Sequence, residues 1–107
     1  MAVKPVQVTK TVTTAGTQIQ VTTSQIYASS IYFEALGSNT GYIYVGGSDV
    51  SSTAYITRLS AGQGFAIAAD SSGNARLGGV DIALSELWVD SSVNGEKCQV
   101  SYLQRTA

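Results

Sequence analysis

The carboxylates are the main candidates for acid–base chemistry in this sequence, because its 107 residues include no histidine and a single cysteine. Hydrolysis of a glycosidic bond would need two carboxylates that face each other across one cleft. The seven acidic residues instead occur singly, and most lie among turn-forming residues, where an Asp side chain accepts hydrogen bonds from nearby backbone N–H groups. We therefore expect structural roles for them, no catalytic residue and no enzyme activity. They are Glu34, Asp49, Asp70, Asp81, Glu86, Asp90 and Glu96.

Two loops and two glycine pairs resemble binding sites for ions or cofactors. Residues 70–74 and 90–94 each place an Asp four residues before an Asn, and oxygen-rich loops of this kind can hold Ca²⁺. Each loop offers only one carboxylate, so Asx-type turns are the better account. Residues 46–47 and 78–79 are Gly-Gly pairs, but no helix follows either pair, as a phosphate cradle requires. The sequence therefore predicts neither a metal nor a cofactor.

Exposed aromatic side chains are the remaining candidates for binding. Tyr42, Tyr44 and Trp88 alternate with aliphatic residues along two expected strands. If the aliphatic residues form the core, these three rings lie on an outer face. There they could anchor a contact between subunits or stack on a sugar ring. We expect a subunit contact, with carbohydrate binding as the alternative.

The same alternation predicts the core. Ile31 and Phe33 share one face of a strand, and Cys98, Val100 and Tyr102 share one face of another. We expect these residues to be buried together, with Cys98 serving as a small apolar side chain rather than as a reactive thiol. A lone cysteine forms no intrachain disulfide, so no oxidising compartment is implied.

Short strands must position all of these side chains. Apolar and polar residues alternate with period two from end to end, and turn residues interrupt them about every 8–12 positions, which is typical of a β-sandwich or barrel. We predict strands over residues 54–59, 64–69 and 97–103, among others, and at most one short helical turn near residues 81–86. With about eight strands, the prediction is an all-β, jelly-roll-like sandwich of two antiparallel sheets. Residues 12–107 form its single domain.

Residues 1–11 are expected to be an extended N-terminal arm or an edge strand, because Pro5, near the start of the segment, is compatible with either structure. We predict that this segment is disordered in the isolated chain and becomes ordered only in an assembly, against a partner subunit, with Lys4 and Lys10 near acidic groups of that partner. Deleting residues 2–9 would then leave the domain folded. Together with the three aromatic residues above, this segment supplies the predicted partner interface, through Val3, Lys4, Pro5, Val6 and Val8.

Charge argues against several classes of partner. The chain has six basic and seven acidic residues, and charged residues make up only 12% of it, about half the usual share. The basic residues form no stripe, so no nucleic-acid partner is predicted.

No signal peptide or membrane-spanning run is visible, so we expect no membrane partner and synthesis in a cytoplasm. A surface with so few charges suits a protein that is covered by other subunits.

An ordered series of short motifs resembles a group of small tailed-bacteriophage virion proteins. No single motif is more than turn or strand chemistry, but together they cover most of the chain. They are Thr-Ala-Gly-Thr at residues 14–17, Ile-Tyr-Phe-Glu-Ala at 31–35, Asn-Thr-Gly-Tyr-Ile-Tyr-Val-Gly at 39–46, Leu-Ser-Ala-Gly at 59–62, the block at 81–90, and Asn-Gly at 94–95.

The resemblance implies a jelly-roll capsid cement or decoration protein with no catalytic residues. Such a protein sits on the outer surface of the virion head, often as a homotrimer, binds the major capsid protein and bridges neighbouring capsomers. Similar sandwiches occur in tail and baseplate parts, so the alternative is a tail or baseplate module, or a carbohydrate-binding module, used in host attachment.

Overall fold

The computed structural model describes residues 2–68 and 82–106, and these form strands with one short 3₁₀ turn. The turn, η2 (Leu84–Glu86), lies inside the window where a helical turn is predicted. No helix of this described part is long and apolar enough to cross a membrane. The strands are β1 (Ala2–Val12), β2 (Ile19–Gln20), β3 (Tyr27–Ala35), β4 (Ile43–Gly46), β5 (Thr57–Leu59), β6 (Gly64–Ala68), β7 (Ile82–Ala83), β8 (Trp88–Ser91) and β9 (Glu96–Thr106).

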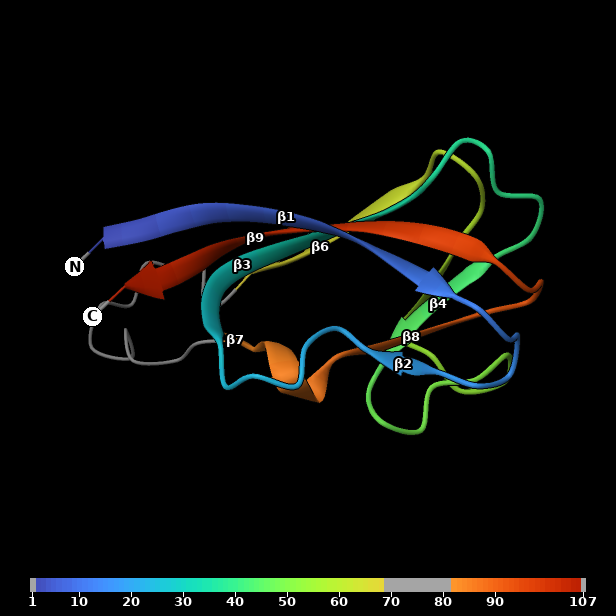
Figure 1. Ribbon diagram of the computed structural model, residues 1–107, viewed down its shortest axis with the longest axis horizontal. Coiled ribbons are helices and arrows are strands. Elements are labelled where there is room, and N and C mark those ends of the chain that lie inside the picture. The colour runs from blue at the N-terminus through green and yellow to red at the C-terminus, as the bar shows by residue number, and fades with distance from the viewer. Residues whose placement is uncertain (1, 69–81, 107) are drawn as a thin grey trace.

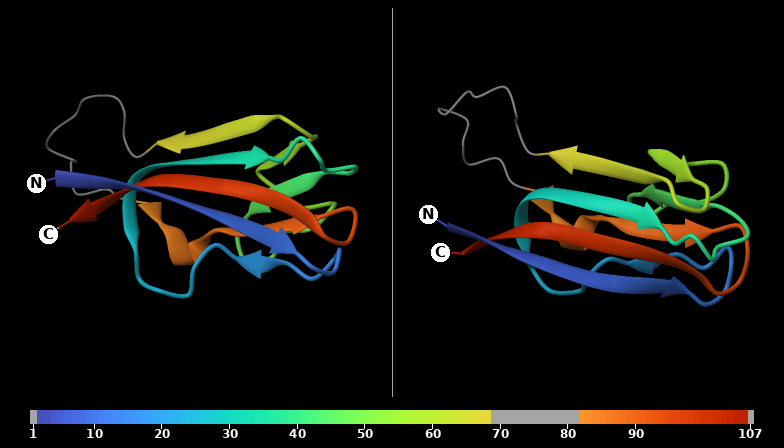
Figure 2. Two further views of the ribbon diagram at one scale, coloured as in Figure 1. Left: turned by 45° about the horizontal axis from the view of Figure 1, so that its top comes forward. Right: turned by 90° about the horizontal axis from the view of Figure 1, so that it is seen from above.

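The strands build two antiparallel sheets that pack face to face (Figures 1 and 2). The five-stranded sheet has the order β1-β9-β3-β6, with the two-residue β7 also pairing with β3, and the four-stranded sheet has the order β2-β8-β4-β5. Apart from β7, the first strand pairs with the last, the second with the next to last, and so on inward, as in one long hairpin rolled into two layers. This is the arrangement of a jelly roll. The predicted all-β sandwich is confirmed.

The N-terminal segment is an edge strand and not a free arm. β1 pairs with β9 along its whole length, from Ala2 opposite Thr106 to Val12 opposite Glu96. The edge-strand alternative is therefore confirmed, and the expectation of an arm that is disordered alone is wrong. Alternating valines on β1 face the same side as the apolar residues of β9, and only a pairing between the two ends of the chain brings them together.

The predicted core residues are buried together between the sheets. Ile31 and Phe33 on β3 pair with Tyr102 and Val100 on β9, and all four are nearly or fully buried. Cys98 is also fully buried, as expected. Burial raises the pKa of its thiol to about 12, because a thiolate would lose its hydration there.

The segment between β4 and β5 departs from the prediction. A strand is expected over residues 54–59, but β5 includes only the last three of them. Residues 47–56 instead fold over the outer side of the four-stranded sheet, where Val50 is buried and lies against Gly46, which has no side chain to displace it. The Ile56 N–H donates to the Val45 carbonyl at 2.7 Å, which fixes the end of this segment on β4.

Two carboxylates expected in turns lie in strands. Asp90 is on β8 and Glu96 begins β9, and both are buried. Glu96 accepts hydrogen bonds from the backbone N–H groups of Thr40, at 2.9 Å, and of Gly41. Their role is therefore the expected one, satisfying backbone donors. The donors to Glu96, and Gly16 as one of the donors to Asp90, lie in loops that are distant in the sequence, while the second donor to Asp90 is the adjacent Ser91. The predicted loop at residues 70–74, the glycine pair at 78–79 and Asp81 lie outside the described residues.

Candidate interaction surfaces

The outer side of the five-stranded sheet, facing away from the other sheet, carries a shallow depression with a volume of about 230 Å³. Strand register explains which side chains surround it. In one row across the sheet, Pro5 on β1 lies opposite Leu103 on β9. The next row crosses four strands and consists of Gln7, Ser101, Tyr32 and Ala66. The side chains in these two rows point away from the core, because they alternate with the buried residues. We call this surface the outer face; around the depression it consists of Pro5, Gln7, Ser30, Tyr32, Ala66, Ser101 and Leu103.

The centre of the outer face is uncharged and partly apolar. Tyr32 and Leu103 are 44% and 38% exposed, and neither of the two rows contains a charged residue. The Tyr32 ring extends over β6, where a side chain on Gly64 would collide with the tyrosine hydroxyl. Exposed apolar side chains that cluster within one patch are typical of protein contact surfaces.

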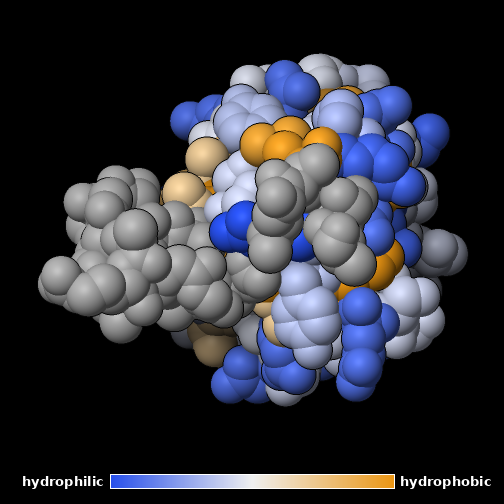
Figure 3. Space-filling view, turned by 90° about the vertical axis from the view of Figure 1, so that its left-hand side faces the viewer, coloured by the Kyte–Doolittle hydropathy of each residue, from blue (hydrophilic) through white to orange (hydrophobic). Residues whose placement is uncertain are grey.

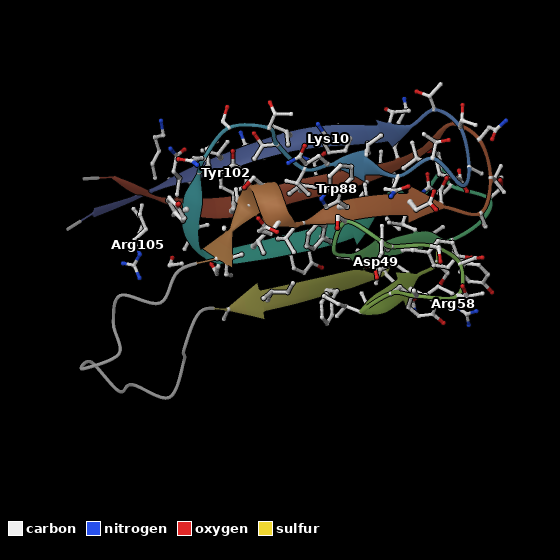
Figure 4. All side chains as sticks on the ribbon, turned by 90° about the horizontal axis from the view of Figure 1, so that it is seen from below. Lys10, Asp49, Arg58, Trp88, Tyr102 and Arg105 are labelled. Atoms are coloured by element: carbon white, nitrogen blue, oxygen red, sulfur yellow. The ribbon has the colours of Figure 1, made fainter. Side chains whose placement is uncertain are left out.

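Among the described strands, β1 lies at the open edge of the five-stranded sheet, beside the outer face. The Gly95 N–H, in a turn with a φ of +82°, donates to the Val12 carbonyl at 2.8 Å, so this carbonyl points toward β9. The backbone N–H and C=O groups of successive residues point in alternate directions along an antiparallel strand. The N–H and C=O groups of the odd-numbered residues of β1 therefore point to the open edge. Pro5 is one of these, and its missing N–H therefore costs no hydrogen bond within the sheet. Figure 4 shows Lys10 on this strand, and Lys4 is exposed further along it.

The predicted aromatic set is only partly exposed. Tyr42 is 39% exposed, and the guanidinium carbon of Arg58 lies 4.3 Å from the centre of its ring. Tyr44 points to the outer side of the four-stranded sheet, as predicted, but is only 5% exposed. The ring of Tyr55, from the segment that folds over this sheet, lies 5.3 Å from it. The expectation that Tyr44 is exposed is therefore wrong, because this segment covers it, and Trp88 (labelled in Figure 4) is half-buried.

The structure divides the predicted interface into two separate surfaces. Val3 and Pro5 join the outer face, while Tyr42 directly precedes β4 and Trp88 begins β8, both in the other sheet. The other predicted interface residues on β1 lie on the inner side of that strand, and they are Lys4, Val6 and Val8. Val6 packs against the core, and Val8 is 37% exposed. Figure 3 views the end of the molecule that carries both termini, where small hydrophobic groups lie among hydrophilic ones.

Sequence reasoning did not place Tyr32, Ala66 and Leu103 together on one exposed surface. Alternation with Ile31 and Phe33 does indicate that Tyr32 points outward. It cannot indicate that Leu103 and Ala66 lie nearby, because that proximity depends on pairing between strands that are far apart in the sequence.

A second pocket, with a volume of about 320 Å³, lies where two loops meet the end of β8. Its lining consists of small residues and the buried Asp90 carboxylate. Ser91 at the end of β8 and Ser92 after it contribute hydroxyl groups, as do Ser51 and Ser52 on the segment over the four-stranded sheet. The lining residues are Ala15, Gly16, Ser51, Ser52, Asp90, Ser91 and Ser92.

Among the described residues, no group of three or more His, Cys, Asp or Glu side chains gathers closely enough to hold a metal ion. Comparisons with family models, curated proteins and solved structures found no match to this chain.

Proposed function

We propose that this chain is a bacteriophage capsid cement or decoration protein. It binds the major capsid protein on the outer surface of the assembled head, associates with further copies of itself as a homotrimer, and bridges neighbouring capsomers. It performs no catalysis. The observation that carries the proposal is the uncharged, partly apolar outer face of a small sandwich, together with the ordered motifs that resemble those of small virion proteins.

The size of the outer face supports assembly in several copies. From the strand lengths, a rise of about 3.3 Å per residue and a spacing of about 4.8 Å, the face covers on the order of 600 Å². A stable protein interface usually buries about 800 Å² on each partner. One copy would therefore bind weakly, and linked copies that engage adjacent capsomers would gain affinity through their high effective concentration.

The edge of β1 supports a second contact with a neighbouring subunit. Its open backbone groups can add an extended strand, which is a common mode of peptide recognition. Pro5, Lys4 and Lys10 limit indiscriminate pairing along this edge, because edge prolines and lysines discourage aggregation. A partner strand with acidic residues near the two lysines would be favoured over an apolar one.

Stabilisation of the capsid follows from selective binding. A protein that binds the assembled lattice, but not the separated subunits, shifts the equilibrium toward the lattice by mass action. When the free concentration of the protein is about 100 times its dissociation constant for the lattice, each binding site adds about 2.7 kcal/mol to the stability of the assembled state.

The test compares two glutamate substitutions at aliphatic residues of similar exposure. Leu103 is 38% exposed on the outer face, and Val93 is 40% exposed in the turn before β9. We expect Leu103→Glu to reduce co-sedimentation with undecorated capsids at least about tenfold, because a charge in a desolvated contact costs over 1.4 kcal/mol. Val93→Glu should bind like the original protein.

Two results would contradict the proposal. If Leu103→Glu saturates capsids as tightly as Val93→Glu, the outer face is not the binding surface. If mass spectrometry of purified particles does not find the chain in the virion, it is not a decoration protein. Specific binding on a glycan array would instead favour the carbohydrate-binding alternative.

A further inference from the structure

The carboxylate of Asp90 is nearly buried, yet within the described part of the chain only one of its oxygens accepts hydrogen bonds. Asp90 is 2% exposed, and its Oδ1 accepts hydrogen bonds from the N–H of Gly16 at 3.0 Å and from the N–H of Ser91 at 2.8 Å. No donor within the described chain reaches Oδ2, and no basic side chain there forms an ion pair with Asp90. A buried carboxylate without a cationic partner is unfavourable, so the position is suited to a ligand.

The second oxygen faces the pocket and not the interior. No fully buried side-chain oxygen or nitrogen of the described residues lacks a hydrogen-bond partner, so Oδ2 must be accessible to solvent. Asp90 lines the pocket of about 320 Å³ at the end of β8, and this pocket is the accessible space beside it. Serine side chains contribute further oxygens: Ser92 Oγ accepts one hydrogen bond, from the Tyr42 N–H at 2.8 Å, so its second lone pair remains to accept from a ligand.

The composition of the lining narrows the class of ligand. A divalent cation usually needs several carboxylates, but the described residues contribute one to this pocket. A sugar site usually offers an aromatic ring, and none of the described residues that line this pocket is aromatic. A guanidinium binds best when each carboxylate oxygen accepts one N–H, but both lone pairs of Oδ1 are already used by backbone donors.

We infer that the Asp90 pocket binds the primary ammonium group of a lysine side chain from the partner protein. An ammonium is a compact charge with three donors, which suits one free carboxylate oxygen and surrounding serine oxygens. The inference specifies one contact of the assembly and rests on the proposed function in requiring a protein partner. The pocket is on a different part of the sandwich from the outer face, so the two contacts can be tested separately.

The binding experiment uses the isolated, ¹⁵N-labelled protein and n-butylammonium, which reproduces the lysine side chain beyond Cα. We expect saturable amide shifts at Gly16, Ser52 and Ser91, with a dissociation constant of about 1–10 mM for so small a ligand. Asp90→Asn should weaken this binding at least about tenfold, because it removes the charge. The variant retains Oδ1 as an acceptor for Gly16 and Ser91, so the fold should persist.

The matched control is Asp49→Asn, which removes the same charge from an exposed residue of the segment over the four-stranded sheet (Figure 4). It should bind n-butylammonium like the original protein. Equal binding by Asp90→Asn, tighter binding of n-propylguanidinium, or displacement of the ammonium by millimolar Ca²⁺ would each overturn the inference.

A second measurement separates this inference from the proposed function. If the isolated protein binds n-butylammonium through Asp90 but does not bind capsids, the proposed capsid role fails while the ammonium site stands. If Asp90→Asn loses the ammonium but saturates capsids like Asp49→Asn, no lysine of the lattice occupies the pocket, and the inferred occupant is wrong.

Discussion

Substituting Phe33 by alanine should remove a large part of the stability of this protein. Phe33 is fully buried on β3, between Val100 on β9 and Phe65 on β6 in the same row. A buried phenylalanine removes about 150–250 Å² from water, which corresponds to about 4–6 kcal/mol at about 25 cal/mol per Å². The alanine that remains, and residual contacts in the unfolded chain, lower the expected loss to about 3–5 kcal/mol.

Urea unfolding followed by tryptophan fluorescence measures this loss, because Trp88 is the only tryptophan. With a slope of about 2 kcal/mol per molar urea, the midpoint should fall by about 2 M. Tyr32→Ala is the matched control, since Tyr32 is the adjacent residue but points to the outer face and is 44% exposed. Its cost should stay below about 1.5 kcal/mol. Equal losses for the two variants would refute the assignment of faces on β3.

Three further predictions follow from the same structure. Burial raises the pKa of the Cys98 thiol from 9.0 to about 12. Below pH 9 the thiol is protonated in both the folded and the unfolded protein, so its contribution to stability is fully present there and is lost as the pH rises toward 12. Between pH 9 and pH 12 the original protein should lose stability faster than Cys98→Ala, by up to about 1.4 kcal/mol per pH unit; parallel urea melts of the two would contradict this. Deleting residues 2–9 should abolish cooperative unfolding, because it removes most of the strand that pairs with β9, and a well-dispersed amide spectrum of the truncated protein would show β1 to be dispensable. EDTA should leave the melting temperature unchanged, since the described residues gather no metal-binding cluster, and a fall of several degrees that Ca²⁺ restores would revive the calcium loops.

The sequence alone determines the class of fold and the buried set on its clearest strands. Side chains alternate across a strand whatever that strand pairs with, so Ile31, Phe33, Val100 and Tyr102 can be assigned to the core from period-two alternation. Turns are local as well, and the turn that ends at Gly95 was predictable because a positive φ favours glycine.

The tertiary structure decides which outward-facing residues are neighbours and which are covered. Pairing of β1 with β9 joins the two ends of the chain, so Pro5 meets Leu103 and the expected arm becomes an edge strand. The segment over the four-stranded sheet buries Tyr44, and the loop that contains Gly16 reaches Asp90 across 74 positions of sequence. Alternation specifies a direction for each side chain, but contacts between distant segments depend on the free energy of packing the whole chain, and no local pattern contains that information.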